Sequence, residues 1–214
     1  MQLYFSPLSC SMATRISLYE AGVEATFTEV DPKTQLTRDG QDFRKVNPLG
    51  LVPTVQTDDG EILTENAAIL QHIANRWPAA NLAPTPMDSR ERERLQQWLC
   101  FIGTELHKAL FVPLLDKKAP EGAKSYALEK GASRLDYLAK YLAGREFLLD
   151  RFSVADAYLF TVLNWSVATP VDLKTWPALM EYVARLRERP SVAKAVREER
   201  TLYAEELARH KASA

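Results

Sequence analysis

The feature that most constrains the fold of this chain is a change of pattern at residues 78–87, a segment that contains three prolines. Before it, short apolar or alternating stretches are separated by turn residues, in the order strand, helix, strand, loop, two strands and helix. After it, apolar residues recur at helical spacing over long stretches, without a strand pattern. We therefore predict an α/β domain over 1–77, a linker over 78–87 and an all-α domain over 88–214.

Apolar spacing and the residues that end each stretch predict the individual elements. The expected strands cover 1–5, 26–30, 53–57 and 61–63. The expected helices cover 11–21, 65–77, 88–115, 122–142, 153–168 and 176–189. Asp58-Asp59-Gly60 makes the last two strands a hairpin. Ser153 and Asp156 have the spacing of a capping box, which is a signal for a helix start.

Composition narrows the class of protein. With a net charge of −1, the protein lacks the excess of positive charge that is typical of nucleic-acid-binding proteins. We find neither a run of the roughly 20 apolar residues that a membrane span needs nor the charged start of a signal peptide. Two cysteines, Cys10 and Cys100, cannot form a disulfide framework and fit a reducing compartment. We therefore expect a cytoplasmic protein without nucleic-acid partner, membrane segment or metal cofactor.

Cys10 follows the first strand and a Ser-Pro turn, and lies where a helix is expected to begin. Free N–H groups and the helix dipole favour an anion there, so a thiol in this place forms its reactive thiolate more readily. The competing interpretation is a small buried structural cysteine. A redox dithiol would need a second cysteine at position 13, where Ala13 stands instead. Any thiol exchange must therefore use a second thiol from another molecule.

Val52 precedes Pro53 at the start of the hairpin. A proline that opens a strand often follows a cis peptide bond. Such a bend would turn the backbone N–H and C=O of Val52 outward, where an extended peptide can pair with them as an added strand does. A plain turn from loop to strand is the alternative.

Thr64-Glu65-Asn66 stands directly before the helix expected over 65–77. With Thr64 as N-cap, Glu65 and Asn66 would lie in the first turn, where a carboxylate is favoured by the helix dipole in any case. The functional interpretation is that Glu65 binds an α-amino group of a ligand. The first-turn N–H groups and the Asn66 side chain would then hold the ligand's α-carboxylate.

The helix expected over 88–115 has two distinct faces. At 100° per residue, a core stripe is formed by Leu95, Trp98, Leu99, Ile102, Leu106 and Leu110. A second arc of roughly 60° holds Cys100, Thr104, His107 and Phe111. A lone histidine on a helix usually lies on the surface or has hydrogen-bond partners within the protein. A semi-polar face beside the core face predicts instead that this row forms the wall of a cleft.

These motifs continue along nearly the whole chain. They are Tyr4-Phe5-Ser6-Pro7 with Cys10-Ser11, Val46-Asn47-Pro48 with Gly50, Val52 and Pro53, Leu63-Thr64-Glu65 with Ala68-Ile69, Trp98-Leu99, Thr104-Glu105-Leu106-His107-Lys108 and Ser153-Val154-Ala155-Asp156-Ala157-Tyr158-Leu159. In these residues the chain resembles the glutathione transferases, and most closely the bacterial beta class. The resemblance implies a thioredoxin-like α/β N-terminal domain, an all-α C-terminal domain, a homodimer, and glutathione bound between the domains as co-substrate.

The resemblance also implies roles for single residues. Cys10 and His107 would lie near the glutathione sulfur and are the candidate catalytic residues. Val52 would pair with the cysteinyl backbone, while Glu65 and Asn66 would hold the γ-glutamyl end. Thr104 would face the same cleft, and the pocket for an apolar co-substrate would include Phe111 and Trp165.

Two positions depart from the pattern of the beta class. Gln35 stands where a lysine commonly binds the glycyl carboxylate, so this contact loses its charge. Cys100 stands where an asparagine usually reaches glutathione across the dimer. Both remain candidate glutathione contacts, and Cys100 adds a possible redox group.

Three functions are consistent with these residues. The first is conjugation of glutathione to electrophilic apolar compounds, as in detoxification. The second is glutathione-dependent thiol–disulfide exchange or peroxide reduction through Cys10. The third is a non-enzymatic scaffold or regulatory module, because one fold can serve many functions. The joint presence of Cys10, Val52, Glu65 and His107 favours an enzyme.

Overall fold

The computed structural model describes residues 1–212, which form two compact units. The first unit joins Met1–Leu82 with the C-terminal helix α8 (Pro190–Ala212), and the second is Ala83–Arg189. The domain expected over 88–214 included residues 190–212. The structure groups them with the first unit, because α8 packs along α1 (Met12–Glu20). Residues 213 and 214 of that expected range lie outside the described residues.

The first unit contains the predicted thioredoxin-like arrangement of a small sheet and helices. Its strands are β1 (Gln2–Phe5), β2 (Thr26–Glu29), β3 (Thr54–Gln56) and β4 (Ile62–Leu63). They lie in the order β2-β1-β3-β4; β1 is parallel to β2 and antiparallel to β3, and β4 closes the predicted hairpin with β3. The helical segments of this part are α1, η1 (Phe43–Lys45), α2 (Asn66–Arg76) and η2 (Pro78–Ala80).

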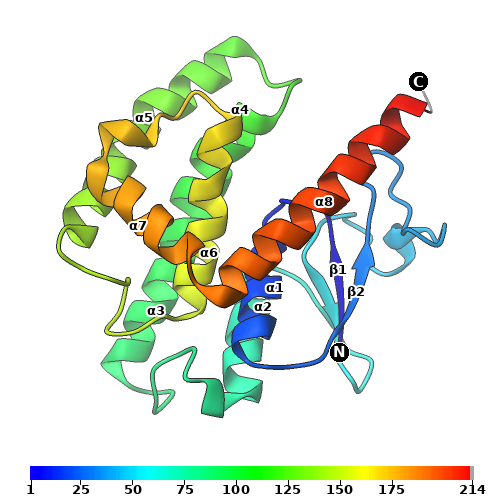
Figure 1. The fold of residues 1–214 in the computed structure, drawn as a ribbon, viewed down its shortest axis with the longest axis horizontal. Helices are drawn as coiled ribbons and strands as arrows, with labels where there is room; N and C mark the ends of the chain where they lie inside the picture. The colour runs from blue at the N-terminus through cyan, green and yellow to red at the C-terminus, as the bar shows by residue number, and fades with distance from the viewer. Residues whose placement is uncertain (213–214) are drawn as a thin grey trace. The chain divides into compact units, whose positions relative to one another are not determined.

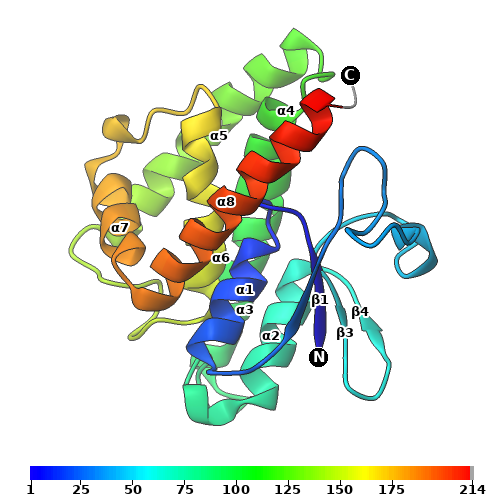
Figure 2. The same cartoon turned by 45° about the vertical axis from the view of Figure 1, so that its right-hand side comes forward.

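Helices α1 and α2 lie together on one face of this sheet, and α8 runs beside α1 (Figure 1, Figure 2). The apolar positions that predicted the elements form the core. Leu3, Ile16, Val55, Ile69 and Ile73 are fully buried. The apolar spacing therefore identified the faces that pack between sheet and helices.

The second unit is entirely helical in its regular structure. Its elements are α3 (Arg90–Phe101), η3 (Ile102–Phe111), α4 (Val112–Leu115), α5 (Glu121–Leu142), α6 (Val154–Leu163), η4 (Asn164–Ala168), η5 (Leu173–Thr175) and α7 (Pro177–Arg187). All ten residues of α6 are buried, so this helix is the centre of the unit. It begins at the predicted capping box, where the Ser153 N–H donates to Asp156 Oδ2 at 2.9 Å.

Asp156 has no exposed surface, and burial raises the pKa of its carboxyl group. Its side chain also accepts the Leu148 N–H at 2.9 Å and the Tyr182 hydroxyl at 2.8 Å. The capping box therefore does more than begin a helix: it ties three segments of the second unit together.

The expectation of one regular α-helix over 88–115 was wrong in its middle. Helix α3 continues through η3 into α4 (Figure 1), but η3 is a π-helix, in which each N–H donates five residues back. The Val112 N–H, for example, donates to the His107 carbonyl. A close approach of η3 to α5 needs Gly131, because a Cβ there would lie 2.4 Å from Leu110.

The helical segment Arg90–Leu115 has an 18-residue window of mean hydropathy 1.3. By length and composition alone, it is the one helix among residues 1–212 that meets the criterion for a membrane span. Core helices of globular proteins meet the same criterion, and Leu95, Leu99 and Leu106 of this segment are fully buried within the second unit. The segment is thus weak evidence for a membrane-spanning helix.

Candidate functional site

Cys10 lies in the turn between β1 and α1, two residues before the helix begins. Its side chain is 9% exposed, and its thiol donates to the Val52 carbonyl at 3.2 Å. The carbonyl of Cys10 accepts from the Asn66 side chain at 3.0 Å, and Asn66 in turn accepts from the Thr14 hydroxyl at 3.2 Å. Three residues from separate sequence motifs, Cys10, Val52 and Asn66, are therefore joined directly.

Glu65 is the N-cap residue of α2, so the expectation that Thr64 caps the helix was wrong by one position. The Glu65 side chain caps nothing and is exposed. Its φ angle is 64°, in the region that residues other than glycine rarely adopt. Such a backbone typically costs about 1–3 kcal/mol and is common where a ligand is bound. The conformation leaves the carboxylate exposed at the helix N-terminus.

Val52 is joined to Pro53 by a cis peptide bond, as the sequence predicted. The segment before it is held by the Asn47 side chain, which donates to the Leu51 carbonyl at 2.8 Å and to the Thr54 hydroxyl at 3.1 Å. Within residues 1–212 the structure records no acceptor for the Val52 N–H. A half-exposed segment with this unused donor can pair with an extended ligand.

Gln35 lies in the loop after β2 with φ of 61°. Its amide nitrogen donates to the Pro32 carbonyl at 3.0 Å, while its amide oxygen is enclosed and has no hydrogen-bond partner. The side chain lies over Gly50, where a Cβ would come within 2.1 Å of the Gln35 oxygen. Gly50 thus makes room for Gln35, and it also has a positive φ of 64°.

Sequence reasoning missed a buried ion pair behind Cys10. Glu199 of α8 is fully buried and lies 3.0 Å from Arg15 of α1, measured between Oε1 and Nε. The other oxygen of Glu199 accepts the Leu8 N–H at 2.7 Å, two residues before Cys10. Burial raises the pKa of Glu199 to about 7, against the opposing effect of Arg15. The spacing of Val192, Ala195, Val196 and Glu199 was a helical signal for α8.

Arg15 packs against two aromatic rings, which are nearly perpendicular to each other. The centre of its guanidinium group lies 4.2 Å from the ring centroid of Phe5 and 4.2 Å from that of Phe27. This places a permanently charged group in the interior of the first unit beside Glu199. The backbone that leads to Cys10 is therefore fixed by a carboxylate of α8, a residue nearly 190 positions away in the sequence.

In the second unit, His107 is buried in an aromatic pocket. Its Nδ1 lies 2.7 Å from the Tyr158 hydroxyl, and its ring packs edge-on against Trp165 with centroids 5.0 Å apart. Burial, with a smaller contribution from Lys108, lowers the pKa of His107 to about 4. The imidazole is thus neutral at physiological pH. Phe111 also packs on Trp165, with centroids 6.0 Å apart.

The structure separates the four residues that were expected to form one row. His107 and Phe111 are buried, whereas Cys100 and Thr104 are exposed. The π-helical turn is the physical reason, because i→i+5 bonding rotates each residue less than the assumed 100°. Thr104 donates to the Cys100 carbonyl at 3.0 Å, a local contact along the helix. His107 contacts Tyr158 and Trp165, and Phe111 packs on the Trp165 ring.

Comparison with known proteins accounts for both units. The model "Glutathione S-transferase, N-terminal domain" matches residues 9–76, and "Glutathione S-transferase, C-terminal domain" matches residues 98–190. The chain belongs to the glutathione S-transferase family. It is 37% identical to glutathione S-transferase GstA of Escherichia coli O157:H7 over 197 residues, which is 92% of this chain and 97% of that protein.

Solved glutathione S-transferases have the same fold. A sphingomonad glutathione S-transferase complexed with glutathione superposes with a TM-score of 0.88 at 42% identity, over 93% of this chain and 98% of that one. The bacterial beta-class enzyme of Sphingomonas chungbukensis gives the same TM-score, identity and coverage. The chain is thus a glutathione transferase most like the bacterial beta class, as its motifs indicated. Within the described residues, no group of His, Cys, Asp or Glu side chains is suited to a metal ion.

Proposed function

We propose that this glutathione transferase conjugates glutathione to electrophilic apolar compounds and so serves detoxification. The observation that carries the proposal is a pair of hydrogen bonds: the Cys10 thiol donates to the Val52 carbonyl, and the Asn66 side chain donates to the Cys10 carbonyl. These bonds join three motif segments within the first unit. The sphingomonad relative, complexed with glutathione, supports the choice of ligand.

Glutathione is held, in this proposal, by groups that the protein leaves unused. The Val52 N–H pairs with the cysteinyl backbone of the extended tripeptide. The exposed Glu65 carboxylate binds the ammonium of the γ-glutamyl group, and N–H groups at the start of α2 bind its carboxylate. Asn66 contributes mainly through its backbone, because its side chain is engaged with Cys10 and Thr14. Gln35 is the exception, because its amide nitrogen already donates to Pro32; it contacts the glycyl end without a charge.

Cys10 positions the glutathione sulfur, whose thiolate is the attacking group. A second candidate reaction is favoured by the same thiol, which forms no disulfide in the described residues. The Cys10 thiolate attacks a glutathione mixed disulfide, forms a Cys10–glutathione disulfide and releases the other thiol as its thiolate. A second glutathione thiolate then attacks this disulfide, releases Cys10 and leaves as oxidised glutathione. The second molecule is necessary because Ala13 stands at the position of a resolving cysteine.

In this proposal the apolar co-substrate binds against the aromatic cluster of Phe111 and Trp165, as the family resemblance implies; both side chains are buried in this structure. His107 donates a hydrogen bond there from Nε2, provided that the Tyr158 hydroxyl donates to Nδ1 and so sets the tautomer. The roles of Thr104 and Cys100 toward glutathione rest on the family resemblance. Both side chains are exposed, that of Cys100 on α3 and that of Thr104 on η3.

The resemblance also supports a homodimer in a reducing cytoplasm. The stripe from Leu95 to Leu110 is buried within the second unit, so it offers no exposed face for a partner. A second chain must therefore bind other surfaces. Sedimentation at micromolar concentration should give twice the mass of one chain, and a monomer would contradict the proposed dimer.

Calorimetry with glutathione tests the binding site. We expect Glu65→Ala to weaken binding by about 2–5 kcal/mol, because the ligand ammonium would lose its partner. Glu61→Ala removes an exposed carboxylate near the same helix and serves as the matched control. Unchanged affinity in Glu65→Ala would refute the assignment of this pocket. Assays with an aryl halide, a peroxide and a glutathione mixed disulfide then identify the reaction, and a protein that binds glutathione without turnover would be a scaffold.

A further inference from the structure

The loop that carries Gln35 is held by the last turns of α8. We propose that Glu205 and His210 of α8 are positioning residues for this loop, residues 31–38, and that they thereby set the affinity for glutathione. The inference rests on the proposed function, because it takes Gln35 as a contact of the glycyl end. Neither α8 residue belongs to the motifs that carry the family resemblance.

The first attachment is at the start of the loop. Asp31 Oδ1 accepts the backbone N–H groups of Lys33 at 2.7 Å and Thr34 at 3.2 Å, so Asp31 shapes the turn that precedes Gln35. Its carbonyl accepts the Gln35 N–H at 2.9 Å. The remaining carboxylate oxygen, Oδ2, lies 2.7 Å from Nε2 of His210. One side chain thus joins the fold of the loop to α8.

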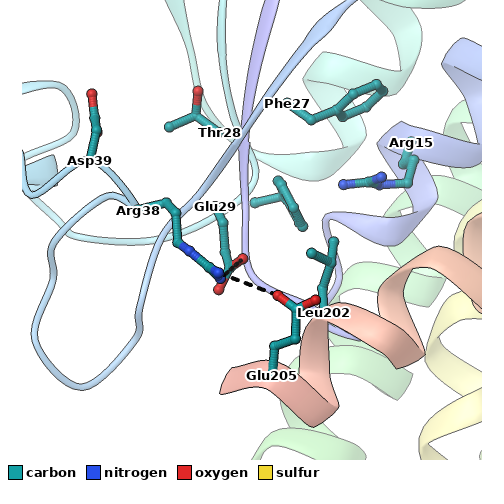
Figure 3. A pocket seen from close by; sticks show the side chains of 9 residues that line it. Arg15, Phe27, Thr28, Glu29, Arg38, Asp39, Leu202 and Glu205 are labelled. Carbon is teal, nitrogen blue, oxygen red and sulfur yellow. Dashed lines mark hydrogen bonds and ion pairs between the residues drawn. The ribbon is translucent and has the colours of Figure 1, made fainter. Parts of the chain in front are cut away.

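The second attachment is at the end of the loop. Arg38 donates through Nη1 to Glu29 of β2 at 3.2 Å and through Nη2 to Glu205 of α8 at 3.3 Å. Figure 3 shows Arg38 reaching from the loop toward Glu29 and Glu205, which approach it from strand and helix. Glu29 is buried and also pairs with Arg209 of α8. Glu205 and Arg209 are one helical turn apart, so this end of α8 presents a connected row of charges.

A hollow lies beside the end of the loop that carries Arg38, between β2 and α8. The hollow has a volume of about 490 Å³, and Arg38, Asp39, Leu202 and Glu205 are among the residues that line it (Figure 3). A segment over a hollow has few apolar contacts with the element behind it, and such segments open at low free-energy cost. The ion pair between Arg38 and Glu205 therefore contributes more to the order of this end of the loop than it would over a packed core.

The orientation of Gln35 follows from the order of the loop. Its φ of 61° and the enclosed position of its amide oxygen over Gly50 require the backbone of the loop to hold one conformation. Release of Asp31 or Arg38 lets residues 31–38 shift as a body. Gln35 then leaves Gly50, and the glycyl end of glutathione loses its contact. The reacting sulfur lies at the other end of the ligand site, beside Cys10, and is unaffected.

The test compares hydrogen exchange and glutathione binding in the wild-type protein and in the double variant Glu205→Gln/His210→Gln. We expect faster amide hydrogen exchange in residues 31–38 of the ligand-free protein. We also expect a Kd for glutathione raised about 3- to 10-fold, the size that the loss of one partly exposed ion pair and one side-chain hydrogen bond gives, with kcat at saturating glutathione unchanged. The control is Arg200→Gln/Lys211→Gln, which alters two exposed residues of the same helix. The loop-side variant Asp31→Asn should reproduce the effect, because it keeps Oδ1 and changes only the contact with His210.

Unchanged exchange in the double variant would show that α8 does not hold the loop and would overturn the proposal. Faster exchange with an unchanged Kd would overturn the link to glutathione affinity. A fall in kcat at saturating glutathione that matches the rise in Kd would also contradict a positioning role confined to binding. Failure of the unchanged protein to bind glutathione would refute the proposed function itself, and the exchange measurement would still decide whether α8 orders the loop.

Discussion

The region of Cys10 and the region of His107 are built in opposite ways. Cys10 lies in a turn, and its contacts are the backbone carbonyl of Val52 and the side-chain amide of Asn66. His107 lies within a helix, and its contacts are aromatic side chains. The first region is therefore specified by where the backbone runs, and the second by which side chains surround one ring.

Each region also buries one titratable group, and burial favours the neutral form of both. Glu199, behind Cys10, has its pKa raised to about 7. His107 has its pKa lowered to about 4. The comparison shows that the same physical cause produces opposite pH dependences, because one group is neutral when protonated and the other when deprotonated.

The largest expected effect concerns Cys10. Cys10→Ala should abolish disulfide exchange, because Ala13 offers no second thiol, and should leave conjugation largely intact, because the attacking sulfur belongs to glutathione. Parallel assays with a mixed disulfide and an aryl halide check this, with Cys100→Ala as the control thiol. Full exchange activity in Cys10→Ala, together with alkylation of Cys10 at the pH of an ordinary thiol, would remove Cys10 from the mechanism.

The second prediction is a loss of stability in acid caused by His107. His107 binds a proton near pH 6.5 in the unfolded chain and only near pH 4 in the folded chain. The free energy of unfolding therefore falls as the pH falls through this window. The loss amounts to about 3 kcal/mol, at about 1.4 kcal/mol for each unit of pKa difference. Urea unfolding at several pH values should show this slope reduced in His107→Gln. Trp165→Phe keeps the imidazole and should keep the slope; an equal slope in His107→Gln would contradict the prediction.

The third prediction has the opposite sign and concerns Glu199. Its pKa is raised on folding from 4.5 to about 7, so its contribution is fully present in acid and is lost as pH rises between these values. The loss amounts to about 3 kcal/mol, and the raised pKa already includes the opposing effect of Arg15. Glu199→Gln can still accept the Leu8 N–H and should lose this dependence. An equal decline in the unaltered protein and in Glu199→Gln over the same window would show that the carboxylate is ionised throughout, and would contradict the prediction.

The smallest effect is expected at the tether of Cys10. Asn66→Ala leaves the Thr14 hydroxyl without its acceptor and removes one donor from the Cys10 carbonyl, at a cost of about 1–3 kcal/mol. Thr14→Val removes only the outer bond and should cost about 1 kcal/mol. Both variants should change the alkylation rate of Cys10, with Asn66→Ala having the greater effect. Equal rates in all three proteins would show that the tether does not position the thiol.

Much of the architecture was predictable because it depends on local rules. The proline segment, the hairpin at Asp58-Asp59-Gly60 and the capping box of Ser153 and Asp156 are short patterns whose physics needs no distant partner. Apolar periodicity likewise identified the faces that form both cores. The family motifs located Cys10, Val52 and Asn66, and the structure joins all three.

Other features depended on what lies against a residue. The sequence by itself determined that His107 stands on a helix beside an apolar stripe, but Tyr158 and Trp165, far along the chain, decided that it is buried and neutral. In the π-helix each hydrogen-bonded turn contains one residue more than in an α-helix, and this separates His107 from Cys100. Helix propensities of single residues do not encode this change. Periodicity reports which face of a helix is apolar. Only the tertiary structure decided what packs against that face. It placed Glu199, from a charged C-terminal stretch, where it accepts the N–H of Leu8 just before Cys10.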